Sequence, residues 1–86
     1  MPAVSRFFGI IITMYHNDHA PPHFHVISGG REAEIEIESL ELLQGSLPPR
    51  ILRLAREWAS RHHDELRVNW RLAREQLPLN NIEPLS

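Results

Sequence analysis

Two hydrophobic periodicities divide the chain, with strand-like alternation up to Gly45 and helical spacing beyond it. Residues 7–15 are almost all apolar and β-branched, which predicts one well-covered strand from Phe7 to Tyr15. Period-two alternation predicts two further strands, at residues 23–28 and 31–38, and a turn near residue 39 predicts a short strand through residues 41–43. The first half of the chain is therefore predicted to form an antiparallel sheet.

The pair Gly29-Gly30 lies between the second and third predicted strands and is typical of a two-residue hairpin turn. Counting outward from this turn pairs Phe24 with Ile35, Val26 with Ala33, His25 with Glu34, and His23 with Glu36. One face of the hairpin is then apolar, and the other carries histidines opposite glutamates. We expect His23 and His25 to point away from the hydrophobic core, on a solvated face beside Glu36 and Glu34.

Helical spacing after Gly45 predicts two helices, at residues 48–61 and 63–77. Ser46 is the expected N-cap of the first helix, and Pro78 is expected to end the second. The apolar stripe that these helices would bury comprises Ile51, Leu54, Ala55, Trp58, Ala59, Leu66, Trp70, Ala73 and Leu77.

These elements predict an α+β fold, with a three- or four-stranded antiparallel sheet and two C-terminal helices packed on one face. A chain of 86 residues is expected to form a single domain over residues 1–86. Within it we expect a β-rich half (1–45), a helical half (46–78) and an extended tail (79–86) that Ile82 and Leu85 anchor.

Composition narrows the functional classes. The chain has no cysteine, which excludes disulfides and thiolate metal sites, and no apolar run approaches membrane-spanning length. The absence of a signal-peptide pattern predicts a cytoplasmic protein with no membrane role. Net charge is −2, which gives no general attraction to phosphate backbones, and all nine basic residues are arginines concentrated in the second half.

Four of the six histidines lie between Tyr15 and His25, where Pro21 and Pro22 stiffen the intervening segment. Imidazole changes its charge near neutral pH and is the commonest metal ligand, so this segment marks a candidate site. The prolines are expected to hold Asp18 and His19 near His23 in a preformed pocket.

The stretch Asn17-Asp18-His19-Ala20-Pro21-Pro22-His23-Phe24-His25-Val26 resembles the defining motif of a small bacterial family of uncharacterised proteins. Similar segments extend the resemblance over most of the chain, including 35–38, 45–50 and 82–85. The resemblance implies that Asn17, Asp18, His19, Pro21, Pro22, His23 and His25 belong to the family motif. It also implies a second small protein encoded by a neighbouring gene, in an arrangement similar to toxin–antitoxin pairs.

Three interpretations of the histidines stay open. In the first, His19, His23 and His25 bind a divalent transition metal, with oxygen from Asp18, Glu34 or Glu36. In the second, the same histidines are a general acid and base that cleave RNA, aided by Tyr15 and an arginine. In the third, they form a solvated ladder with the glutamates and have no chemical role.

Arg67, Arg71 and Arg74 share one face of the second predicted helix, where they form either a solvated surface or a patch for nucleic acid. We expect His62 and His63 to make a turn or a cap between the helices. The functional prediction is a small binding or regulatory protein of a two-protein module, centred on residues 17–25. The alternative is a small metal-dependent or ribonuclease-like hydrolase that uses His19, His23 and His25.

Overall fold

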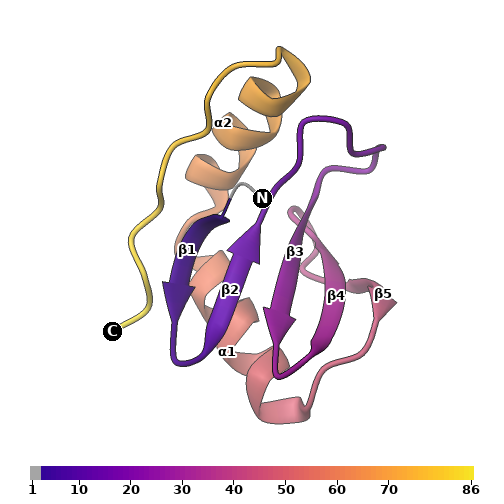
Figure 1. The fold of residues 1–86 in the computed structure, drawn as a ribbon, viewed down its shortest axis with the longest axis vertical. Coiled ribbons are helices and arrows are strands. Elements are labelled where there is room, and N and C mark those ends of the chain that lie inside the picture. The colour runs from indigo at the N-terminus through magenta and orange to yellow at the C-terminus, as the bar shows by residue number, and fades with distance from the viewer. Residues whose placement is uncertain (1–2) are drawn as a thin grey trace.

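The computed structural model describes residues 3–86, which form five strands followed by two helices. The elements are β1 (Ala3–Phe7), β2 (Ile10–Thr13), β3 (His23–Ser28), β4 (Arg31–Glu36), β5 (Leu42–Gly45), α1 (Pro49–Ser60) and α2 (His63–Arg74). The strands pair in sequence order, and every pairing is antiparallel (Figure 1). The predicted α+β class is confirmed, with one strand more than the three or four expected.

The additional strand comes from a hairpin in the first apolar segment. Residues 7–15 were predicted to form one strand, but β1 and β2 pair with each other around Phe8 and Gly9, and the single-strand prediction is wrong. Phe8 has φ +48° and Gly9 has φ +76°, the two positive values that a two-residue hairpin turn requires. Glycine adopts this conformation readily, whereas phenylalanine seldom does, so the turn carries no clear sequence signal.

The β3–β4 hairpin has the predicted register. Phe24 lies opposite Ile35, and His25 lies opposite Glu34, around a turn in which both glycines have positive φ. Phe24, Val26, Ala33, Ile35 and Ile37 are all buried, as the alternation predicts. The hydrophobic pattern therefore determines which face of this hairpin meets the core.

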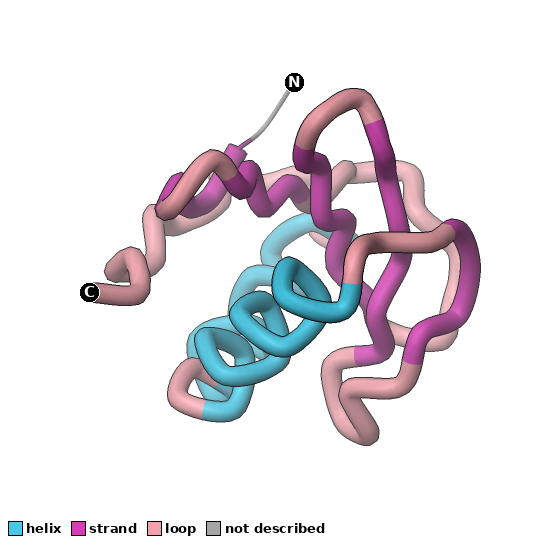
Figure 2. Tube along the Cα trace, turned by 90° about the horizontal axis from the view of Figure 1, so that it is seen from below, coloured by secondary structure: helices cyan, strands magenta, loops and turns pink. Residues whose placement is uncertain are grey.

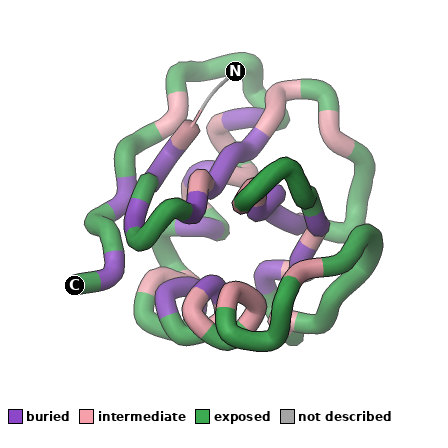
Figure 3. Tube along the Cα trace, turned by 60° about the horizontal axis from the view of Figure 1, so that its bottom comes forward, coloured by how far each residue is buried: buried purple, intermediate pink, exposed green. Residues whose placement is uncertain are grey.

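Helix α1 covers the apolar face of the sheet, and the strands arch over the helical layer (Figure 2). Trp58 of α1 is fully buried, with its ring centroid 5.6 Å from that of Phe7 and 5.9 Å from that of Phe24. Buried positions run through the central strands, whereas the outer loops are exposed (Figure 3). The core is thus closed on one face of the sheet only.

The helix boundaries agree with prediction to within three residues at each end. Ser46 is not the cap of α1: the N-cap position is Pro48, whose carbonyl accepts from the Leu52 N–H at 3.0 Å. Pro49 at the first position has no N–H to satisfy, so a side-chain cap has less to stabilise. Helix α2 ends before Leu77, which was predicted on the apolar stripe and is exposed instead.

The tail after α2 runs extended beside β1 (Figure 1). The Ile82 N–H donates to the Val4 carbonyl at 2.8 Å, and the Trp58 indole N–H donates to the Glu83 carbonyl at 2.8 Å. Ile82 and Leu85 are both buried. Within the described part of the chain, neither helix has the length and apolar character needed to cross a bilayer.

Candidate functional site

The connection between β2 and β3 holds the histidine motif at one end of the sheet (Figure 1). Hydrogen bonds hold this connection near its beginning and near its end. The His16 ring Nε2 donates to the Leu77 carbonyl at 2.9 Å, and the Ile37 N–H donates to the Pro22 carbonyl at 3.0 Å. The Ala20–Pro21 peptide bond is cis. The two hydrogen bonds hold the motif against the segments that follow α2 and β4.

His23 and His25 lie on the sheet face opposite the core, as the register predicts, but they are not solvated. Their relative exposures are only 5% and 6%. Tyr15 packs edge-on against His25, with ring centroids 4.7 Å apart, and Trp70 of α2 lies 5.4 Å from the His23 ring. The predicted solvated ladder is therefore wrong, because side chains from the loop and from α2 cover the imidazoles.

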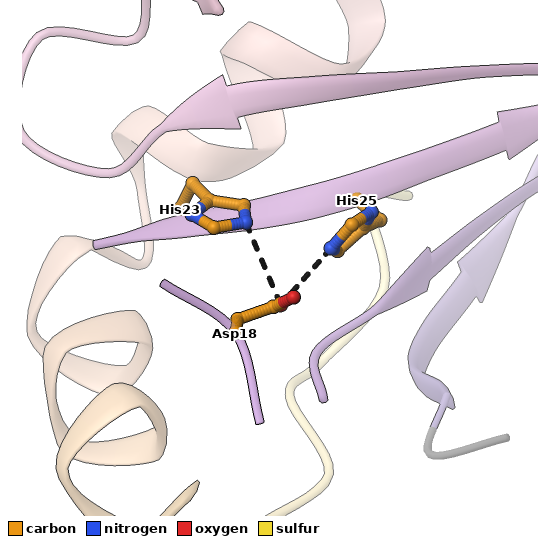
Figure 4. Close-up of side chains that lie close together, drawn as sticks. All are labelled: Asp18, His23 and His25. Atoms are coloured by element: carbon orange, nitrogen blue, oxygen red, sulfur yellow. Dashed lines mark hydrogen bonds and ion pairs between the residues drawn. The ribbon is translucent and has the colours of Figure 1, made fainter. Parts of the chain in front are cut away.

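Asp18 reaches over β3 and faces both histidines (Figure 4). Its Oδ2 atom is 3.0 Å from His25 Nε2 and 3.5 Å from His23 Nε2. One ligand atom from each of the three side chains lies within 4.8 Å of the others. Two buried imidazoles and a carboxylate thus converge on one point.

The glutamates of β4 contact the histidines diagonally. His25 lies opposite Glu34 in the register, yet its Nδ1 atom is 3.1 Å from Glu32 Oε2. His23 lies opposite Glu36, yet its Nε2 atom is 3.5 Å from Glu34 Oε1. Each ring thus meets the glutamate two positions from its direct partner, a distance that long side chains span across strands.

Glu36, which was predicted as a site residue, instead accepts a hydrogen bond from the Ser39 hydroxyl. It holds the turn after β4 rather than facing the histidines. Glu32 takes part in the site in its place, and the diagonal geometry of antiparallel strands is the signal that would have identified it.

A cleft of about 330 Å³ opens beside the three converging side chains. It is lined by Asp18, His19, Ala20, Pro21, His23, Glu34, Leu43 and Gln44. A second cleft of about 210 Å³ continues along β4 and β5, lined by Glu32, Ala33, Glu34, Gln44 and Gly45. The two clefts share Glu34 and Gln44, and we refer to them together as the acidic groove.

The remaining predicted site residues are spread around the groove. His19 is exposed in its lining and lies outside the three-residue group that contains Asp18, His23 and His25. Asn17 is exposed in the turn, and Pro21 lines the groove. The Pro21 carbonyl also accepts from His23 Nδ1 at 2.8 Å, so the proline segment orients the imidazole directly.

Sequence reasoning missed two contributors besides Glu32. Trp70, predicted to belong to the core, is half-buried and packs against the core, and its ring also lies against His23, a contact that the helical stripe does not indicate. Thr13 lies opposite His25 on β2 and is fully buried, and within residues 3–86 its hydroxyl has no hydrogen-bond partner. The alternation of β2 places it on the histidine face.

Arg67 of α2 makes its contacts with acidic side chains other than those that face the histidines. Arg67 forms a bidentate pair with Glu38, at 2.6 and 2.8 Å, and a third contact with Asp64 at 2.7 Å. Its hydrogen bonds hold the pKa of the Glu38 carboxyl below the ordinary value of 4.5 and raise the pKa of the guanidinium. One of the three arginines on the predicted nucleic-acid face is thus already engaged within the protein.

His62 occupies the N-cap position of α2, and its Nδ1 atom lies 2.5 Å from Glu65 Oε1. This agrees with the structural role predicted for the histidines between the helices.

When the sequence is compared with known proteins, it matches one family. Neither a curated protein nor a solved structure matches the chain. A family described as "Domain of unknown function (DUF4160)" matches residues 9–71, a span that includes the histidine motif, all of the acidic groove and most of α2. Because the match covers more than half of the sequence, the chain belongs to this domain-of-unknown-function family.

Proposed function

We propose that this protein is a small binding or regulatory protein whose acidic groove recognises a positively charged segment of a partner protein. The observation that carries the proposal is the lining of the groove. Asp18, Glu32 and Glu34 place three carboxylates along it, and no arginine from the described residues lines either cleft. A surface of this charge attracts lysine and arginine side chains and repels phosphate.

The dimensions of the groove support a peptide-like ligand. It extends from the motif loop along β4 and β5 to Gly45, so an extended segment of a few residues fits along it. Leu43 adds an apolar contact at one end. Because hydrogen bonds already fix the loop and the histidines, little conformational entropy is lost when a partner binds.

The partner proposed first is the protein encoded beside this one. The resemblance of the motif to its bacterial family implies such a neighbour in a toxin–antitoxin-like module. A cytoplasmic setting belongs to the same proposal. In that arrangement the groove would receive a basic segment of the neighbouring protein.

The alternative is a hydrolase, and the charge of the groove argues against its metal-free form. A phosphodiester positioned at His23 would lie beside Asp18 and Glu34, both within 3.5 Å of that ring. Ribonuclease-type catalysis requires a cation at the phosphate, and among residues 3–86 no arginine lines this cleft. A metal-dependent hydrolase would require the site inferred in the next subsection.

The test measures binding of the purified neighbouring protein by calorimetry, with native protein and a Glu34→Gln variant. We expect a one-to-one complex that weakens as salt is raised, and a Kd about tenfold higher for the variant, chiefly through slower association. The matched control is Glu75→Gln, which removes the same charge from an exposed position after α2, outside both clefts. That variant should bind as the native protein does.

Two results would overturn the proposal. One is a complex whose affinity is the same in the Glu34→Gln variant and in the native protein. The other is no complex at all, together with turnover of RNA or of a phosphoester by the native protein, which would favour the hydrolase.

A further inference from the structure

We infer that Asp18, His23 and His25 form a binding site for a divalent transition metal of the Zn²⁺ type, with the Glu34 carboxylate next to His23. The inference goes beyond the proposed partner binding and does not depend on it. It follows from the convergence of two imidazole nitrogens and a carboxylate oxygen at one end of the acidic groove (Figure 4).

The distances between the ligand atoms suit a single ion. Metal bonds of about 2.0–2.2 Å to nitrogen and oxygen place neighbouring ligand atoms about 3.0–3.5 Å apart in octahedral or tetrahedral geometry. Asp18 Oδ2 lies 3.0 Å from His25 Nε2 and 3.5 Å from His23 Nε2. Glu34 Oε1 is a further 3.5 Å from His23 Nε2. The ligand atoms of Asp18, His23 and His25 thus lie close enough together for one ion, and the Glu34 carboxylate lies outside this group, next to His23.

The outer contacts of both histidines orient them for this role. His23 Nδ1 donates to the Pro21 carbonyl at 2.8 Å, so Nε2, which lies 3.5 Å from Asp18 Oδ2, is the nitrogen available to bind an ion. His25 Nδ1 lies 3.1 Å from Glu32 Oε2, so a carboxylate can hold its proton in the same way. Metal-binding histidines typically donate their second nitrogen to a carbonyl or a carboxylate.

The burial of the imidazoles and the negative charge around them also favour a bound cation. Both imidazoles are nearly inaccessible, whereas the Glu34 side chain is 30% exposed in the cleft. The site would therefore be closed by protein on the histidine side and open to solvent or a ligand on the groove side. Asp18, Glu32 and Glu34 supply three negative charges around the centre, which a divalent cation offsets.

The donor set limits the choice of metal. Two imidazoles with carboxylates suit borderline ions such as Zn²⁺, Ni²⁺ or Fe²⁺, whereas Ca²⁺ and Mg²⁺ prefer oxygen ligands alone. His19 lies outside the group of three, so it is not a first ligand in this arrangement. This differs from the set of three histidines that the sequence predicted, with Asp18 taking the place of His19.

The experiment titrates the untagged, chelator-treated full chain with Zn²⁺ by calorimetry and with Co²⁺ by visible absorption. We expect one ion per chain and Co²⁺ bands typical of bound nitrogen and oxygen ligands. Asp18→Asn and His25→Gln should each weaken binding by about a hundredfold or more. Glu32→Gln, which removes only an outer contact, should weaken it by roughly tenfold to a hundredfold.

His62→Gln is the matched control, because His62 also faces a carboxylate but lies at the start of α2, away from the groove. It should leave the affinity unchanged. The native protein provides a readout that needs no variant to fold: bound Zn²⁺, which is diamagnetic, should shift the NMR signals of the His23 and His25 rings and leave those of His62 nearly unchanged.

The inference fails if the native chain binds no ion in one-to-one ratio, or if Zn²⁺ shifts the His62 or His63 signals instead of those of His23 and His25. Equal affinity in native protein, Asp18→Asn and His25→Gln would also overturn it. Partner binding is then measured with metal-free protein. A complex formed by metal-free protein supports the proposed partner binding whether or not the chain has a metal site. Metal bound by a chain that forms no complex supports the metal site and overturns the proposed partner binding.

Discussion

At the scale of single residues, aromatic side chains from outside β3 and β4 bury the His23 and His25 imidazoles. The alternation of β3 and the Gly29-Gly30 turn place His23 and His25 on one face, and the structure agrees. The Tyr15 ring covers His25, and the Trp70 ring covers His23, although Trp70 is more than forty positions from His23 in the chain. A periodicity says which face a side chain takes, but only tertiary packing decides whether solvent reaches it.

Gly45 shows how one residue sets the shape of the groove. It has φ +82°, and a Cβ atom there would lie 2.8 Å from the Ala33 Cα and still closer to the Glu32 carbonyl oxygen. The backbones of β4 and β5 meet too tightly for any side chain. Glycine is therefore required for both conformation and space at the groove floor.

We expect Gly45→Ala to lower the free energy of unfolding by about 1–3 kcal/mol, because it adds a clash to an unfavourable backbone conformation. Urea denaturation followed by circular dichroism measures this. Gly30→Asn is the control: φ there is +78°, nothing lies within 4 Å of the added Cβ, and asparagine tolerates this region. A Gly45→Ala variant as stable as the native protein would show that β5 shifts freely away from β4.

At the scale of elements, strands and helices with a strong pattern are predictable, and the failures have specific causes. The β1–β2 hairpin was missed because its turn uses Phe8 in a left-handed conformation. The end of α2 was placed too late because Leu77 continues the apolar spacing, although Gln76 has φ +59° and the helix is already over. In both places backbone conformation departs from what the side chains favour locally.

The contact between Glu38, in the turn after β4, and Arg67 of α2 leads to a pH-dependent prediction. Arg67 lowers the pKa of Glu38 through its hydrogen bonds, so the unfolded chain holds the Glu38 proton more tightly than the folded chain does. The stabilisation is therefore present above the ordinary pKa of 4.5 and is lost as the pH falls through the lower, folded value.

In an Arg67→Gln variant, carboxyl NMR should show the Glu38 titration midpoint moving up toward 4.5. The difference in stability between native protein and variant should shrink as the pH is lowered through the folded-state pKa. Arg71→Gln, on the same helix, should leave the Glu38 midpoint unchanged. An unchanged midpoint in the Arg67→Gln variant would mean that this pair does not form in solution.

At the scale of the whole molecule, α1 covers the apolar face of the sheet, and the site lies on the opposite face, where the motif loop and Trp70 of α2 cover it. The C-terminal tail completes the closed side through Ile82 and Leu85. On the opposite face, the buried side chains are polar: Thr13, His23 and His25. A domain of 86 residues buries a limited apolar area, so a bound ion would contribute a large share of its total stability.

This gives the last prediction, which links the inferred metal site to folding. An ion that binds the native state and not the unfolded chain stabilises it by about 2.7 kcal/mol at a concentration one hundred times its Kd. For a domain of this size, that corresponds to a rise in Tm of roughly 10–20 °C. Scanning calorimetry of chelator-treated protein, with and without Zn²⁺, measures the rise.

Asp18→Asn should abolish most of that rise, because it removes the ligand that faces both histidines at 3.0 and 3.5 Å. His62→Gln should retain it in full. A Tm that Zn²⁺ leaves unchanged in the native protein would mean that Asp18 serves only to hold the two imidazoles by hydrogen bonds. Metal ions also bind unfolded histidine-rich chains, and this binding reduces the rise in Tm. An affinity calculated from the rise is therefore a lower bound on the affinity of the folded site.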